Sequence, residues 1–558
     1  MYAMTPSRAL LLLIISLLFL APLLNPLLEL LRTPHALQAW LEADRLLELL
    51  SNTALLALVA TSIAVPLGTL LGVFLARGFC IGSTFAKLLL ACVLFMPLPV
   101  LAVAWQIVLG NWLAPIRSGP GSVAWQPWNL GLLPAGIVHG FAALPWVVWI
   151  VSAVLQNTDE QLEEEATLLG GSRMNFRFVL LPRLTWAVLA ACAWVCVQTA
   201  TEIPITDSMM VRTFAEEVYT QLIIGGAGLA QAVAITVPVW LVALLVATLI
   251  ANRIPKHLGS STQEVRLMGR KVPGLRWRIF GTLVTYCVVF VVGILPLLAL
   301  VWRAAGGTIS KNASAVTLIQ ELEKVALTRG SILLSSLAAA LVCGAITAIL
   351  ALLACRAANR VRWLRLSLFA LCLILFLTPG PLIGMGLKSF IMNLLDAEDA
   401  VLNHLGIAPV FPPLRSALFD QPSPIPGIWA GMLRFFPLAV LILAPAIRAI
   451  PRELYDETRL LGRGFGIEWK LLLSPLVGTA FWRAMLAVAV LALGEVSATK
   501  QVNPPFYNSY ILRLFDQMHY GPESSVAALC LLQVFTTIVL SILMFKMAPF
   551  FHFNEVPK

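Results

Sequence analysis

The sequence predicts an all-α, polytopic membrane protein built from two tandem units of six transmembrane helices. Three observations lead to this fold class: a strongly apolar composition, apolar stretches of membrane-spanning length along the whole chain, and patterns of the first half that return in the second. Of the 558 residues, 59% are hydrophobic and only 12% are charged, whereas an average soluble domain is about a quarter charged. We expect the excess of apolar side chains to face lipid.

Apolar stretches of about 20 residues, the length that crosses a bilayer, recur twelve times. None has the alternation of a strand, and a segment in lipid must satisfy its own backbone hydrogen bonds, so we expect helices. The first stretch is longer than the apolar part of a signal peptide and is followed by a poor cleavage site, so we expect it to be retained. The stretches lie at 9–31, 51–76, 85–110, 133–155, 185–204, 226–250, 279–302, 329–354, 367–391, 426–449, 480–498 and 524–547.

The distribution of basic residues predicts the orientation of the chain. With a cytoplasmic N-terminus, 25 of the 38 Lys and Arg residues lie in segments on the cytoplasmic side, as the positive-inside rule requires. Nucleic-acid binding is the other interpretation of a net charge of +10, but these charges are divided among loops between spans. We therefore predict a bacterial inner-membrane protein that is surrounded by lipid, has both termini in the cytoplasm and binds no nucleic acid.

The second half of the chain repeats features of the first half in the same order. Two of the matches, Pro182 with Pro475 and Glu202 with Glu495, are both 293 residues apart. The other matches are Pro97-Leu98-Pro99 with Pro379-Gly380-Pro381, 136–140 with 427–431, and Leu168-Leu169-Gly170 with Leu460-Leu461-Gly462. This order predicts two permease units, 1–251 and 279–558, joined by a cytoplasmic linker at 252–278. Parallel repeats of this kind suit a transport pathway between the two halves.

A polar loop follows the fourth apolar stretch of each unit, at about 156–183 and 448–480. Acidic residues near its start suit a helix N-terminus, where the helix dipole stabilises negative charge. A glycine later in the loop then ends that helix. We expect each loop to be a short helix, a glycine break and a second amphipathic stretch that leads back to the membrane.

These loops resemble the EAA loop of ABC importer permeases, whose pattern is Glu-Ala-Ala, a glycine, an aromatic residue and a proline. The first copy has one residue fewer between glycine and proline, and the second replaces the small residues by Glu and Thr. The residues that carry the resemblance are Glu164, Glu165, Ala166, Gly170, Phe176 and Pro182 in the first copy, and Asp456, Glu457, Thr458, Gly462, Trp469 and Pro475 in the second.

The resemblance covers nearly the whole chain as two fused permease units. In that family the loop docks into a cleft on the ATP-binding subunit and passes ATP-driven closure to the membrane helices. The resemblance therefore implies two partners: ATP-binding cassette ATPase subunits, expected as a homodimer, and a periplasmic substrate-binding protein.

Motifs for chemistry within the chain itself are missing from the sequence. It contains no GxxxxGK[ST] phosphate-binding loop. Its nine cysteines form no CxxC pair, and its His, Asp and Glu residues have no metal-site spacing. We predict a transport subunit that is not an enzyme and binds no cofactor or metal of its own, with ATP used by the partner ATPase.

Four ionisable residues inside or at the ends of apolar stretches are candidates for lining the pathway, because charge inside a membrane is costly and rarely without a role. They are Glu202, Glu495, Arg434 and His139. Arg434 and Glu495 lie at similar depths, so we predict that they pair, and that His139 is the nearest equivalent partner for Glu202. A purely structural role in the helix bundle is the alternative.

Fused double permeases of this kind resemble ferric-iron importers, with thiamine importers close behind. The iron-type resemblance lies in 201–207 and 211–219, which we place on the outer side. Polyamine, sulfate and phosphonate permeases share the loop but usually consist of two chains. We expect ferric iron as the cargo, with thiamine or another small solute as the alternative.

Two other classes of membrane protein compete with this interpretation. A major-facilitator-type secondary transporter also has twelve helices in two halves, but its Gly- and Arg-rich loop would here be 77–82, which has no acidic residue. A membrane enzyme would need catalytic carboxylates or histidines gathered in one loop, and no loop has them.

Overall fold

A computed structural model describes most of the chain, and every segment of regular structure within the described part is helical. The described residues are 14–33, 35–36, 43–112, 130–156, 158, 160–223, 233–234, 236, 274–308, 312–359, 361–406, 412–461 and 465–546.

Eight helices in the described part are long and apolar enough to cross a membrane, and two bent helix pairs raise the number to ten if each pair is one span. These ten coincide with the predicted second to fifth and seventh to twelfth stretches. The first stretch, 9–31, begins outside the described residues and is not among these candidates. The sixth, 226–250, and the linker, 252–278, lie largely outside the described residues. A polytopic helical protein is therefore confirmed, while the number twelve stays a prediction.

In the first unit, a long helix is followed by a broken span, by another long helix and by the loop that leads into a further long helix. Its helices are α2 (Ala21–Arg32), α3 (Ala43–Ala76), α4 (Ser83–Leu94), α5 (Leu98–Ile107), α7 (Leu132–Gln156), α8 (Glu160–Met174), α9 (Leu181–Thr201), α10 (Pro204–Ser208) and α11 (Phe214–Ile223). Short π-helical segments are η1 (Ser16–Leu20), η3 (Val108–Trp112) and η4 (Asn175–Leu180). Helices α3, α7 and α9 pack against one another.

The second unit repeats this order. Its helices are α13 (Leu275–Val289), α14 (Leu295–Ala304), α15 (Ala315–Ala358), α16 (Arg362–Leu377), α17 (Gly380–His404), α18 (Pro413–Arg415), α19 (Ile425–Arg448), α20 (Arg452–Leu461), α21 (Phe465–Glu468), α22 (Ser474–Leu493), α23 (Thr499–Val502), α24 (Tyr510–Tyr520) and α25 (Glu523–Lys546). Its π-helical segments are η5 (Phe290–Ile294), η6 (Ser416–Asp420) and η7 (Trp469–Leu473). Helices α15, α19 and α22 pack together as α3, α7 and α9 do.

The first helices of both units contact the other unit. Helix α2 packs against α17 of the second unit, and its neighbour η1 contributes Phe19, whose ring lies 4.3 Å from that of Phe436. Helix α14 packs against α5 of the first unit, and α13 contacts α3 and α4. Each unit therefore buries apolar surface against the other, which favours their folding as one body.

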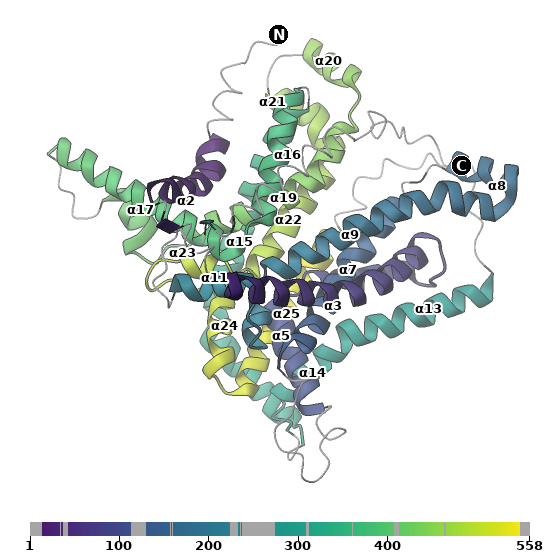
Figure 1. The fold of residues 1–558 in the computed structure, drawn as a ribbon, viewed down its shortest axis with the longest axis horizontal. Helices are drawn as coiled ribbons and strands as arrows, with labels where there is room; N and C mark the ends of the chain where they lie inside the picture. The colour runs from purple at the N-terminus through teal and green to yellow at the C-terminus, as the bar shows by residue number, and fades with distance from the viewer. Residues whose placement is uncertain are drawn as a thin grey trace.

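Figure 1 shows two groups of helices that diverge. Helices α16, α19 and α22 run toward the top of the view, where α20 and α21 lie, whereas α3, α7, α9 and α13 run toward the right, where α8 lies. Helix α17 projects to the left and α24 lies near the bottom. The loops that resemble the EAA loop thus lie at the far ends of the two diverging groups.

The spans that contain the two proline motifs are broken. Helices α4 and α5 meet at Pro97 with a bend of 98°, and α16 and α17 meet at Pro379 with a bend of 109°. Both breaks contact the segment after α22, because a Cβ on Gly494 would lie 2.9 Å from the Cβ of Pro97, and one on Gly380 would lie 2.4 Å from that of Ser497. The breaks of both units therefore converge on one place.

Candidate functional site: a cavity between the units and two exposed loops

A cavity of about 270 Å³ lies where the broken spans converge. Residues of α4, α5, α7 and α9 line it from the first unit, and residues of α16, α19 and α22 line it from the second. Most of the lining is apolar, and its charged residues are Glu202, Arg434 and Glu495. Three of the four predicted pathway residues are therefore brought together here.

Arg434 pairs with Glu202, not with Glu495 as the sequence analysis predicted. The Arg434 Nη2 lies 2.9 Å from Glu202 Oε1 and 3.4 Å from the Thr201 hydroxyl. The side chains are 9% and 20% exposed, respectively, so water screens the pair only weakly. The ion pair joins the two units across the cavity. Similar depth along two helices did not determine the partner, because depth leaves open which way each side chain points.

Arg434 also binds the backbone at the broken span of its own unit. Its Nη1 donates a hydrogen bond of 3.0 Å to the carbonyl of Thr378, directly before the break at Pro379. A proline break leaves carbonyls without intrahelical donors, and in a membrane they need other partners. The planar guanidinium can donate in two directions at once, so one side chain ties α19 to the break and to Glu202.

Glu495 has a different partner because it lies beyond the end of α22, which stops at Leu493. Its carboxylate accepts hydrogen bonds from the backbone N–H groups of Ala498 and Thr499, at 2.8 and 2.9 Å. It thereby caps the short helix α23, which follows directly. Glu495 is 7% exposed and lines the cavity.

His139 does not pair with Glu202, which corrects the second predicted contact. It is buried in α7, and its Nε2 has no hydrogen-bond partner among the described residues. It is also not among the residues that line the cavity. His139 therefore packs inside the first unit.

An aromatic wall, which the sequence analysis missed, lines the same cavity. The ring of Trp194 lies 4.7 Å from that of Trp146 and 4.8 Å from that of Phe376. Next to it on α9, Gln198 also faces the cavity. Trp194 Nε1 and Gln198 Oε1 are buried and have no hydrogen-bond partner among the described residues. This side of the cavity therefore contains a hydrogen-bond donor and an acceptor without partners, next to the aromatic rings.

Metal coordination needs several ligands in one place, and the described residues contain no group of three or more His, Cys, Asp or Glu that could hold a metal ion. Glu202 and Glu495 are the two carboxylates that line the cavity in this part of the chain.

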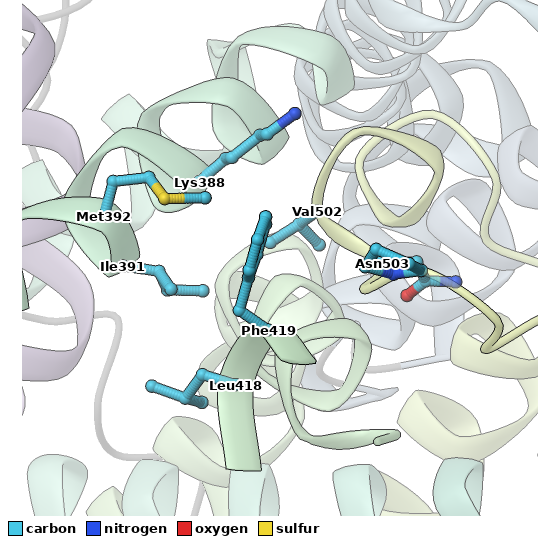
Figure 2. Close-up of a pocket in the computed structure, with 8 residues that line it drawn as sticks. Lys388, Ile391, Met392, Leu418, Phe419, Val502 and Asn503 are labelled. Carbon is cyan, nitrogen blue, oxygen red and sulfur yellow. The ribbon is translucent and has the colours of Figure 1, made fainter. Parts of the chain in front are cut away.

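A second cavity of about 250 Å³ lies between α17, η6 and the segment after α23. Figure 2 shows the Phe419 ring in the middle of this region, with Lys388 and Met392 of α17 on one side and Val502 on the other. Its lining is mainly apolar.

The loop of the first unit has the predicted form, a short helix with a glycine break. The chain leaves helical geometry at Gly170 and Gly171, and Gly171 has a φ of +71° and a ψ of −172°, a region almost restricted to glycine. Glu164 and Glu165 are exposed, whereas Ala166 is buried.

Beyond the break, η4 contains Phe176, and α9 carries Pro182 in its first turn. Both residues are exposed.

The loop of the second unit follows the same plan. Asp456 and Glu457 are exposed on α20, and Thr458 is buried like its counterpart Ala166. Gly462 lies outside the described residues. Trp469 begins η7, and Pro475 lies in the first turn of α22.

Both loops expose a pair of leucines directly before the glycine position. Leu168 and Leu460 are 87% and 88% exposed, and the leucine that follows each is also largely exposed. Contiguous exposed apolar surface marks contacts with other proteins or with a membrane.

Comparisons of this chain with protein-family models, with curated proteins and with solved structures found no match.

Proposed function

We propose that this chain is the transmembrane permease of an ATP-driven, binding-protein-dependent importer of the ABC type. The observation that carries the proposal is the pair of equivalent loops, each with exposed leucines beside a helix break and each leading directly into a cavity-lining helix, α9 or α22. A partner that binds both loops at once could change the angle between the two diverging groups of helices. The cavity between those groups would then be the substrate pathway.

Co-purification with the ATPase tests this proposal. The full chain, expressed with its ATPase, should retain a homodimer of that ATPase in detergent. Changing Leu168, Leu169, Leu460 and Leu461 to serine should reduce retention at least tenfold. Leu405→Ser is the matched control, since Leu405 is equally a large exposed leucine but lies at the end of α17. Equal retention by the fourfold variant and the wild type would reject the loops as the docking sites.

For the cargo we propose ferric iron. Support comes from the resemblance of 201–207 and 211–219 to iron-type permeases. Further support comes from the two carboxylates at the cavity, Glu202 and Glu495, since carboxylate oxygen is a favourable contact for a hard cation. Uptake of ⁵⁵Fe(III) by vesicles that contain the chain, its ATPase and its binding protein should require ATP. ATP-dependent uptake of another solute without uptake of iron would reject iron as the cargo but not the assignment as an importer.

The aromatic wall favours a second candidate cargo, an organic cation with flat aromatic rings such as thiamine. Trp146, Trp194 and Phe376 offer ring faces, and the unpartnered groups of Trp194 and Gln198 offer a donor and an acceptor. Stacking on such faces would stabilise a flat cation. Gln198→Leu should then reduce uptake of labelled thiamine, and the same vesicles assayed with ⁵⁵Fe(III) separate the two cargoes.

A major-facilitator-type secondary transporter remains the functional alternative. Transport that persists without any ATPase subunit would favour it.

A further inference from the structure

Each exposed loop is tied to the end of a long helix by an arginine. Arg77, directly after α3, donates from Nη1 to both carboxylate oxygens of Glu163 on α8, at 2.9 and 2.7 Å. Arg356, in the last turn of α15, donates from Nε to Glu468 Oε1 at 2.7 Å and from Nη2 to Glu468 Oε2. The two units thus place the same kind of contact at the same kind of position.

Both contacts are at least partly shielded from water, unlike most surface ion pairs. The side chains of Arg77 and Glu163 are each 13% exposed, and those of Arg356 and Glu468 are also partly buried. Arg356 donates from two nitrogens to the two oxygens of Glu468 and is therefore held in orientation as well as in distance. The Nε and Nη2 of Arg77 are buried and have no hydrogen-bond partner among the described residues, so Arg77 reaches Glu163 through Nη1.

The acid is placed differently in the two loops. Glu163 precedes the glycine break of its loop, whereas Glu468 at the end of α21 follows the break position. In the first unit the arginine therefore holds the helix that bears the exposed leucines, and in the second it holds the segment that leads into α22.

The long helix next to each arginine packs closely against a neighbouring helix at a glycine. A Cβ on Gly68 of α3 would lie 2.6 Å from the Cβ of Val147 on α7, and one on Gly344 of α15 would lie 2.3 Å from the Met485 carbonyl oxygen on α22. Such close contacts move as one body. A displacement of either loop is thus passed at its arginine to a rigid pair of membrane helices.

We propose that Arg77 and Arg356 are the positioning residues through which the two loops move the membrane helices. This inference rests on the proposed function, because it requires a partner ATPase that displaces the loops. Each arginine acts through its acid: the loop supplies the contact with the partner, and the ion pair supplies the connection to α3 or α15.

The test separates docking from transmission in the full importer. Arg77→Gln and Glu163→Gln should each retain the ATPase homodimer at the wild-type level but lower transport per ATP hydrolysed at least fivefold. The exchange Arg77→Glu with Glu163→Arg restores the pair with reversed sign and should recover at least half of the lost transport per ATP. The same set at Arg356 and Glu468 should behave alike.

Lys324→Gln is the control, because the exposed Lys324 pairs with Glu321 of the same helix at 3.8 Å. Unchanged transport per ATP in the single variants, or no recovery in the exchanged pair, would overturn the inference. A role limited to folding would instead lower the amount of folded protein and leave the ratio of transport to ATP unchanged. Failure of the wild-type chain to retain any ATPase would reject the proposed function, a result that these variants cannot mimic.

Discussion

Arg434 of the second unit and Glu202 of the first form an ion pair of 2.9 Å across the cavity, and the same guanidinium binds the carbonyl of Thr378 at a helix break. One side chain thus links the two units and supplies a hydrogen-bond donor to a backbone carbonyl at the break of a span.

Removal of one partner of this pair should be costly. Arg434→Gln leaves Glu202 poorly compensated and should destabilise the protein by about 3 kcal/mol, the scale for breaking a buried pair. The midpoint of thermal unfolding in detergent measures this loss. Adding Glu202→Gln to the variant removes the uncompensated charge and should recover part of it. A double variant less stable than Arg434→Gln would contradict the pairing.

Arg434→Lys should not be conservative. A lysine amine lacks the planar fork and cannot hold the Glu202 carboxylate and the Thr378 carbonyl in the observed geometry. We expect transport to fall although the charge is kept. Uptake by vesicles containing the complete importer is the measurement, and wild-type uptake by this variant would mean that charge alone is required.

Two variants of Glu495 distinguish a role in capping α23 from a role in transport. Glu495→Gln keeps one acceptor oxygen for the N–H groups of Ala498 and Thr499, whereas Glu495→Ala keeps none and should cost about 1 kcal/mol as the loss of a helix cap. If the negative charge serves the pathway, Glu495→Gln should assemble normally and transport poorly. Normal transport by this variant would remove Glu495 from the pathway and leave it the capping role.

The glycine break in the first loop should not tolerate a side chain. Gly171→Ala forces a residue with a Cβ into a φ of +71° and a ψ of −172°, at a cost of about 1–3 kcal/mol. We expect α8 to be displaced and retention of the ATPase to fall. Gly466→Ala is the matched control in the second loop, because a Cβ there meets open space.

The contact between α17 and the segment before α23 depends on Gly384. A Cβ at this position would lie 2.3 Å from the carbonyl oxygen of Ala498, so Gly384→Ala must push the two segments apart. We expect a lower unfolding midpoint and loss of the cap that Glu495 provides. Gly330→Ala, in α15 with nothing within 4 Å, should be neutral or slightly stabilising. Equal midpoints for the two variants would contradict the close approach.

Much of this structure follows from local properties of the sequence. Apolar length, the prolines at 97 and 379, and the glycines of the first loop determine where helices start, break and end, because these effects act within a few residues. The helices, both broken spans and the form of the loops were predictable for this reason. The role of the chain as an importer subunit stays a proposal.

Only the tertiary structure decided which side chains meet. The sequence predicts a similar depth for Arg434 and Glu495. In the structure α22 ends before Glu495, whose carboxylate caps α23, and Arg434 contacts Glu202 of the other unit instead. The aromatic wall and the pairs made by Arg77 and Arg356 join residues more than 40 positions apart. Such contacts depend on how packed helices are rotated and inclined, which spacing along a single chain does not encode.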